Sequence, residues 1–127
     1  MSVRRILVAS AAALIMTSSH AVFAADAPAK KSGDMLVNPT GMTLYVFDKD
    51  APASGKSVCN GQCATNWPPL MATGDAKPAG EWSVVTRDDG TKQWAYKGRP
   101  LYQWSKDQKP GDKSGDGIGG MWHVAND

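Results

Sequence analysis

Short stretches in which apolar and polar side chains alternate, separated by turn residues, make up most of this chain. The β-prone runs lie at residues 35–37, 43–47, 82–87, 92–96, 100–105 and 121–124. An Asp-Gly step at Asp89-Gly90 separates two of them, and such a step is a strong hairpin signal. We therefore expect residues 82–105 to form an antiparallel meander. Residues 35–47 should form a hairpin around Pro39 and Gly41.

No segment of the chain shows a long helical period. Residues 59–67 could hold one helical turn, which Pro68 and Pro69 would then end. Residues 106–120 are rich in Gly, Asp and Lys and are expected to form a surface loop. The pattern predicts an all-β fold: a small antiparallel domain with at most one short helical turn near the two cysteines.

One segment of the second half of the chain repeats a segment of the first half. Residues 41–50 and 98–107 share Gly, Leu, Tyr, Lys and Asp in register at an offset of 57, and Phe47 stands where Trp104 stands. In each segment the tyrosine and the aromatic residue two positions later share one face of a strand. Because aromatic side chains dominate small cores, we expect these faces to point into a shared interior; an aromatic ligand groove is the alternative.

A second match supports the same internal repeat. Trp67 and Trp122 correspond at an offset of 55, and both are expected to be structural. The domain is therefore predicted to contain two related β units, at about residues 35–70 and 82–124.

Residues 1–24 have the pattern of a signal peptide. A basic start precedes an apolar stretch and a small-residue cleavage site at residues 22–24. The apolar stretch is too short to span a bilayer comfortably, so we expect no membrane span in the mature chain. We predict a periplasmic or secreted protein after cleavage near Ala24, with residues 25–34 as a disordered tether and residues 35–127 as one domain.

The charge balance argues against one class of partner. Removing the signal peptide takes away Arg4 and Arg5, which leaves 12 basic and 12 acidic side chains. No basic patch is visible that could neutralise phosphates, so nucleic acid is not expected as a partner. We expect a monomer without a cofactor.

The repeated residues carry a resemblance to a known family. The chain resembles the secreted repeats, or predicted lipoproteins, that share a Tyr-x-aromatic-x-x-Asp motif. The motif occurs here twice, at Tyr45, Phe47 and Asp50 and at Tyr102, Trp104 and Asp107. The resemblance covers about residues 35–124 and implies one β unit used twice. Many members look like lipoproteins, whereas this chain has no cysteine near the cleavage site. The resemblance implies no activity.

Cys59 and Cys63 are the only cysteines of the chain. In an oxidising compartment an isolated pair four residues apart is most simply a structural disulfide. The alternative is a redox-active or metal-binding thiol pair, although the spacing differs from the C-x-x-C of the thioredoxin type. The pair occurs only in the first unit, so it is an addition to the repeat.

Met121 and His123 are weak candidates for a metal site. His123 is the only histidine left after cleavage, which argues against a cluster of histidine ligands. A thioether, an imidazole and the ring of Trp122 would suit Cu(I), with Met121 and His123 on one face of a strand. The simpler interpretation is a core tryptophan flanked by edge residues, so we expect no metal.

Asp50 and Asp107 each stand at the end of a strand. Such a pair of carboxylates could do acid–base chemistry, but capping a turn through backbone N–H groups is the simpler explanation. Gly41 and Gly98 likewise look like turn glycines with unusual dihedral angles.

The sequence favours a non-catalytic binding or interaction module of the cell envelope. Exposed loops stand on a rigid β scaffold, and no catalytic set of residues is assembled. The partner would be an unknown envelope protein or a small ligand. The alternative is a periplasmic redox or copper-handling protein that uses Cys59 and Cys63 or Met121 and His123.

Overall fold

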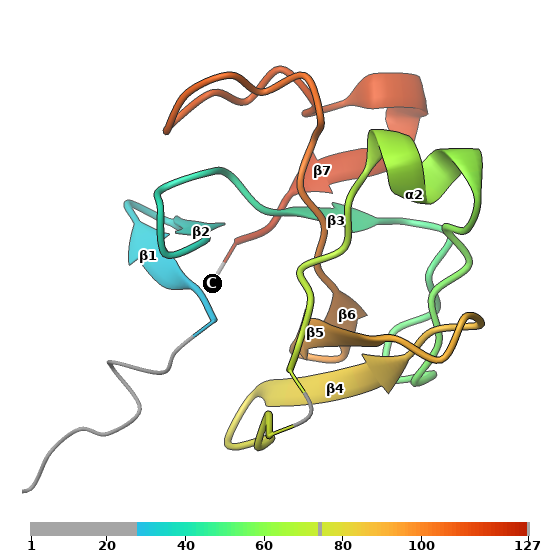
Figure 1. Ribbon diagram of the computed structural model, residues 1–127. Coiled ribbons are helices and arrows are strands. Elements are labelled where there is room, and N and C mark those ends of the chain that lie inside the picture. Colours follow the sequence, from blue (N-terminus) through green and yellow to red (C-terminus); the bar gives the residue numbers. More distant parts are fainter. Residues whose placement is uncertain (1–27, 74, 127) are drawn as a thin grey trace, which may run out of the picture.

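Three small antiparallel sheets form the framework of the structure, a computed structural model that describes residues 28–73 and 75–126 (Figure 1). The sheets pair β1 (Lys30–Ser32) with β2 (Met35–Val37), β3 (Tyr45–Phe47) with β7 (Trp122–Val124), and β4 (Trp82–Thr86) with β5 (Lys92–Tyr96) and β6 (Arg99–Pro100). The predicted all-β antiparallel fold is confirmed, and so is the meander of the second half, although its third strand is Arg99–Pro100 and does not extend over the predicted residues 100–105.

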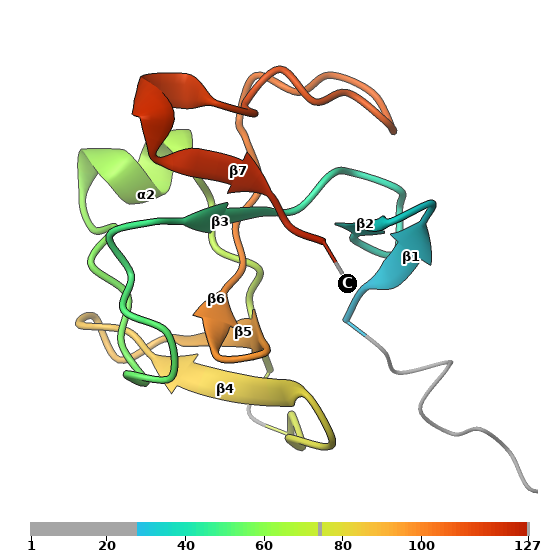
Figure 2. The same ribbon diagram turned by 180° about the vertical axis from the view of Figure 1, so that it is seen from behind.

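The central pair of strands joins the two halves of the chain. β3 comes from the first repeat and β7 is the last strand of the second, and they lie side by side in both views (Figures 1 and 2). Their register places Phe47 opposite Trp122 and Tyr45 opposite Val124. The predicted last strand thus pairs with the other half of the chain.

Two short helical turns stand at corresponding places in the repeats. The first, α2 (Gln62–Asn66), lies next to the cysteines, as predicted. The second, η1 (Ile118–Gly120), lies in the segment predicted to be a plain surface loop. It begins after Gly117, whose φ of 83° lies in the region that favours glycine, so the glycines of this segment indicate a turn.

The start of the domain was predicted too far along the chain. Residues 30–32, assigned to a disordered tether, form β1, which pairs with β2, and Ala29 before it is buried. The side chains of β1 are exposed on both faces, so the strand has no apolar alternation that could mark it. The expected signal peptide and residues 25–27 lie outside the described residues.

Each repeat contributes its final segment to the sheet of the other repeat. The N–H of Leu70, at the end of the first repeat, donates to the carbonyl of Leu101 over 2.9 Å. The N–H of Ala125, at the end of the second, donates to the carbonyl of Leu44 over 2.8 Å. These two bonds correspond under the offsets of the internal repeat, so the chain has an approximate two-fold axis and its two halves interlock.

The core consists of two clusters on opposite sides of the central backbone. One cluster contains the leucines of the repeated segment, and its buried members are Ala29, Leu36, Leu44, Leu70, Leu101 and Ala125. The other contains the tyrosines, and its buried members are Tyr45, Phe47, Cys59, Trp67, Tyr102 and Trp122. Successive residues of a strand point to opposite faces, which is how Leu44 and Tyr45 reach different clusters.

Among the described residues, no helix has the length and apolar character needed to cross a bilayer.

Candidate functional site

The motif tyrosines and aspartates pair between the repeats and not within them. The hydroxyl of Tyr45 donates to Oδ2 of Asp107 over 2.6 Å, and the hydroxyl of Tyr102 donates to Oδ2 of Asp50. All four side chains are buried. The Tyr-x-aromatic-x-x-Asp segment of one repeat is therefore completed by the same segment of the other.

The second oxygen of each aspartate holds a loop. Oδ1 of Asp50 accepts the N–H of Val58 over 2.7 Å, and Oδ1 of Asp107 accepts the N–H of Ser114 over 3.0 Å. The expected contact with backbone N–H groups is thus present. The sequence did not indicate the crossed tyrosine contact.

Burial sets the ionisation of these groups. Desolvation raises the pKa of Asp50 above its ordinary value, while the bonds from Tyr102 and Val58 and the charge of Arg87 act against it. Burial and the neighbouring carboxylates raise the pKa of Tyr45 and of Tyr102, so both phenols keep their protons at neutral pH. The phenols are hydrogen-bond donors here and are poorly suited to act as bases.

Four aromatic rings from the two repeats alternate in one stack. Phe47 stacks on Trp122 with ring centroids 4.1 Å apart, Trp122 on Trp67 at 3.7 Å, and Trp67 on Trp104 at 4.1 Å. The order of repeats is first, second, first, second. The expected shared aromatic interior is therefore present, and the stack fills it with rings, leaving no aromatic groove there.

The tyrosines close this stack from the side. Tyr45 meets Trp67 edge-on with centroids 5.4 Å apart, and Tyr102 meets Trp122 edge-on at 5.1 Å. Edge-to-face contacts of this kind stabilise beyond the area they bury. Each tyrosine therefore packs against a ring of its own repeat and bonds to the aspartate of the other repeat.

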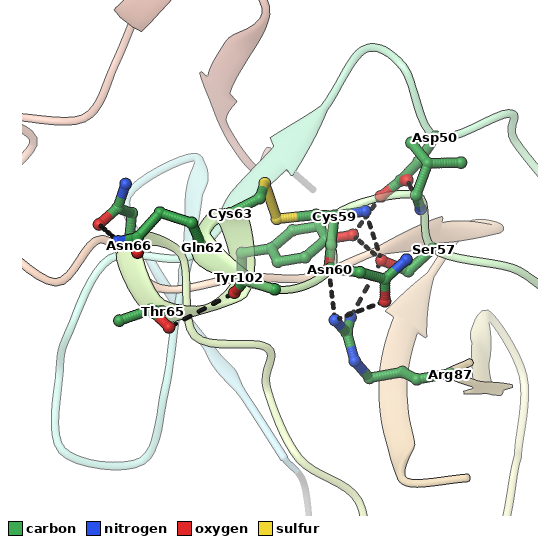
Figure 3. Close-up of a disulfide and its surroundings, with 12 residues drawn as sticks. Asp50, Ser57, Cys59, Asn60, Gln62, Cys63, Thr65, Asn66, Arg87 and Tyr102 are labelled. Atoms are coloured by element: carbon green, nitrogen blue, oxygen red, sulfur yellow. Dashed lines mark hydrogen bonds between the residues drawn. A yellow bond between two sulfur atoms is a disulfide. The ribbon is translucent and has the colours of Figure 1, made fainter. Parts of the chain in front are cut away.

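A disulfide joins Cys59 and Cys63 at the edge of the aromatic cluster (Figure 3). Cys59 is fully buried, whereas Cys63 is partly exposed on α2. The disulfide closes the turn that leads into the helix. No free cysteine is present among the described residues.

A buried arginine lies beside the disulfide (Figure 3). Nη1 of Arg87 donates to Oε1 of Gln93 over 2.8 Å and to Oγ of Ser57 over 3.0 Å, and Nη2 donates to the carbonyl of Cys59. Ser57 in turn shares a hydrogen bond of 2.6 Å with the hydroxyl of Tyr102. The guanidinium is therefore connected through Ser57 and Tyr102 to Asp50, which supplies the compensating charge.

The sequence did not identify this arginine or its glutamine. Arg87 immediately precedes the hairpin turn of the meander, where a charged residue is normally solvated. Gln93 occupies an inward position of β5 and donates its amide to the carbonyl of Leu101 over 2.7 Å. A polar residue on the inward side of an alternating strand is the one signal that could have indicated it.

Gly41 and Gly98 each lie in a turn of one repeat, at a point where that turn contacts a loop of the other repeat. Gly41 has a φ of 93° and Gly98 a φ of 79°, a region that favours glycine. A Cβ at Gly98 would lie 2.9 Å from the backbone nitrogen of Ala53, and one at Gly41 would lie 3.0 Å from Cβ of Pro110. Both the dihedral angle and the close approach therefore require glycine at these positions.

A groove of about 380 Å³ lies between the central strands and the meander of the second repeat. Its apolar lining residues are buried or half-buried: Val46, Tyr96, Leu101, Val124 and Ala125. Its polar lining residues are exposed: Asp48, Lys97, Arg99, His123 and Asn126. A neighbouring hollow of about 490 Å³ shares His123, Val124 and Asn126 but is lined mainly by exposed polar residues. We favour the first as a binding site because it combines an apolar surface with a few polar groups.

His123 is held at the edge of this groove by one carboxylate. Its Nε2 lies 2.7 Å from Oδ2 of Asp48 across the β3–β7 pair. Met121 lies instead against the aromatic cluster. The expectation that Met121 and His123 share a strand face is wrong, because Met121 precedes β7 and has the non-extended angles φ −116° and ψ −14°. Among the described residues, no group of three His, Cys, Asp or Glu side chains could hold a metal ion.

The two-fold axis generates a corresponding face on the other side of the molecule, and its chemistry differs. Residues that correspond to Val46, Asp48, Arg99, His123, Val124 and Asn126 are Gln103, Ser105, Met42, Pro68, Pro69 and Met71. On that face Nδ2 of Asn38 donates to Oε1 of Gln103 over 3.3 Å, which links the two repeats. Among these corresponding residues, the charged side chains therefore all lie on the groove face.

Comparison with protein families matches this architecture. A family model described as a secreted repeat of unknown function matches residues 27–71 and, a second time, residues 83–126. The chain belongs to this family. Comparison with curated proteins and with solved structures gives no match.

Membership in the secreted-repeat family accounts for the duplicated unit. The matched segments coincide with the interlocked halves of the fold, and the description of the family agrees with the predicted export of the chain. The first matched segment begins before the predicted domain start at residue 35, in agreement with β1.

The side chains of the secreted repeat that are available for binding lie on its surface. The buried tyrosines, aspartates and arginine are used in contacts that hold the repeats together. The groove offers a cationic and apolar surface with one imidazole–carboxylate pair. Such a surface is suited to bind a ligand, and it provides no nucleophile beside a base.

Proposed function

We propose that this secreted repeat is a non-catalytic binding module that works outside the cytoplasm, in the cell envelope, after cleavage of a signal peptide near Ala24. The ligand site is the groove between the central strands and the meander. The observation that carries this proposal is the difference between the two equivalent faces. One face is linked by Asn38 and Gln103, whereas the other is an open groove with Asp48, Arg99 and His123 at its edge.

The rigidity of the core supports a binding role. The stacked rings and the crossed tyrosine–aspartate bonds fix the two repeats relative to each other, so the groove between them is preformed. A preformed site loses little conformational entropy when a ligand binds. The volume of about 380 Å³ lies within the range of small-molecule sites, roughly 300–1,000 Å³.

A fragment screen by NMR on the full mature protein tests this proposal. With uniform ¹⁵N labelling, we expect fragments to shift the amide signals of Val46, Val124 and Asn126, and to leave those of Gln103 and Met71 unchanged. Val46→Gln, which copies the residue of the opposite face, should weaken these shifts. If shifts occur only on the opposite face, or nowhere, the groove is not the binding site.

Thiol–disulfide exchange at Cys59 and Cys63 is a second candidate, supported by a comparison of the repeats. The turn of η1 closes without a cross-link, so the fold does not require one at α2. An external thiolate would attack the partly exposed Cys63 sulfur, form a mixed disulfide with it and release Cys59 as a thiolate. Alkylation and mass analysis in glutathione buffers of graded potential test this. Exchange at the potential of the envelope would support it, and a disulfide that survives millimolar reduced glutathione would exclude it.

A further inference from the structure

We propose that the groove takes a small organic carboxylate with an apolar body, and that Arg99 binds the carboxylate group. This inference rests on the proposed binding function and names the chemical class of the ligand.

Among the described residues that line the groove, positive charge is in surplus. Asp48 is engaged by His123 at 2.7 Å, so the one carboxylate among the lining residues already has a partner. Lys97 lies over the ring of Tyr96, with its Nζ 5.5 Å from the ring centroid. This contact leaves the ammonium group exposed at the groove. An anion is therefore the complementary ligand charge.

Arg99 is the cation that is most available. Within residues 28–73 and 75–126, its guanidinium has no hydrogen-bond or ion-pair partner, while its backbone is fixed by the pairing of β6 with β5. A guanidinium presents two parallel N–H groups that match the two oxygens of a carboxylate. The sheet thus fixes the backbone of Arg99, and its guanidinium is available to a ligand.

The apolar part of the ligand would lie on the wall beside this cation. Val46, Leu101 and Val124 form an aliphatic surface, and the ring of Tyr96 lies next to it in the groove. Burying an apolar group on such a surface stabilises the complex in proportion to the area removed from water. A carboxylate without an apolar body would forgo this contribution, so inorganic anions and acetate should bind weakly.

The opposite face shows that this chemistry is not dictated by the fold. Met42 stands at the position of Arg99, and Thr40 at the position of Lys97, under the same offset of 57. The turns around these positions differ in detail: Lys97 has a φ of 51° in the turn between β5 and β6, whereas the first repeat closes its turn with the bond from the N–H of Gly41 to the carbonyl of Asn38. The two cations are therefore particular to the second repeat.

Titration of the full mature protein with 4-phenylbutanoate and with 4-phenylbutanamide tests the inference. The two probes have the same apolar body and differ in the charged group. Following Val46 and Val124 amide signals, we expect the carboxylate to bind about fivefold more tightly than the amide, the ratio that an exposed but bidentate ion pair supports. Arg99→Met, which copies Met42, should remove most of the difference, because Lys97 remains as the second cation of the groove. Lys77→Met removes the same charge outside the groove and should preserve it.

The possible outcomes separate the inference from the proposed function. If both probes shift the groove signals with equal affinity, or if Arg99→Met leaves the preference intact, the carboxylate inference is overturned and the groove remains a binding site. If neither probe shifts the groove signals, the carboxylate inference is overturned. If, in addition, the fragment screen finds no groove binder, the binding function fails as well.

Discussion

The backbones of Tyr45 and Tyr102 exchange both of their hydrogen bonds, with N···O distances of 2.8 Å and 2.9 Å. Each residue is the central tyrosine of its repeat, so this pair lies on the approximate two-fold axis. The side chains then cross the axis, each to the aspartate of the opposite repeat. The repeated motif is therefore the device that joins two copies of one unit into a single core.

The crossed bonds predict which mutations depend on each other. Tyr45→Phe removes a donor from the buried Asp107 and should lower the free energy of unfolding by about 1–3 kcal/mol. In a double-mutant cycle, Tyr45→Phe and Asp107→Asn should couple by about 1 kcal/mol. Tyr45→Phe and Asp50→Asn, which lie in the same repeat, should be additive within about 0.5 kcal/mol. Urea denaturation of the native protein and of the single and double mutants gives the free energies of unfolding from which these effects are calculated. Stronger coupling within the repeat than across it would contradict the crossed arrangement.

The raised pKa of Asp50 predicts a pH dependence of stability. Between the ordinary pKa of an aspartate, near 4, and the higher pKa of the folded state, the folded chain holds more protons than the unfolded chain. The contribution of this group to the free energy of unfolding should therefore fall as pH rises through that window and level off above the folded pKa. Plots of the free energy of unfolding against pH should therefore differ in slope between the native protein and Asp50→Asn within that window. Parallel curves would show that Asp50 does not titrate in this way.

Substitution of Arg87, which immediately precedes the hairpin turn of the meander, is expected to lower the free energy of unfolding strongly. Arg87→Met leaves Gln93 and the carbonyl of Cys59 without a donor and removes the cation that compensates Asp50. We expect the free energy of unfolding to fall by about 2–4 kcal/mol. Lys92→Met is the control in the same hairpin, because Lys92 bonds the exposed Thr86, and it should change stability by less than about 0.5 kcal/mol. Equal effects of the two changes would mean that Arg87 is solvated in solution.

Gly115 predicts a steric limit on the aromatic stack. A Cβ at this residue would lie 2.8 Å from Cη2 of Trp67 and 3.0 Å from Cγ of Trp104, in a backbone region that any residue can adopt. Gly115→Ala should therefore displace the rings, alter the near-ultraviolet circular dichroism and cost about 1–3 kcal/mol. At Gly117 the space is open and only its φ of 83° opposes a side chain, so Gly117→Ala should leave the spectrum unchanged. An unchanged spectrum in Gly115→Ala would contradict the stacked geometry.

The sequence predicted the parts of this fold that depend on neighbouring residues. The meander follows from the Asp89-Gly90 turn, and the existence of two related units follows from the recurrence of Tyr45 at Tyr102. The internal repeat shows that two units share a shape, but it does not state which strand of one pairs with which strand of the other. The crossed pairing is set by contacts more than 50 residues apart, so no local pattern could reveal it.

Less of the candidate site could be predicted from the sequence, for a related reason: its residues come from distant parts of the chain. His123 stands out as the sole histidine of the predicted mature chain, but its partner Asp48 lies in the other repeat, directly after β3. No local pattern singles out Arg99, because the groove that it lines is formed by the second repeat together with β3 and β7. The comparison of the two faces, which isolates these residues, requires the two-fold axis of the folded chain.

The measurement that tests the interlocked core most directly is the folding of the chain truncated after Gly80. This fragment lacks β7, Tyr102, Trp104 and Trp122, so it loses the partners of Tyr45 and the alternate rings of the stack. We expect the fragment, as a monomer at micromolar concentration, to show the circular dichroism and NMR spectra of an unfolded chain, and to fold when the fragment 81–127 is added. A monomeric fragment that unfolds cooperatively on its own would show that each repeat has an independent core and would contradict the account.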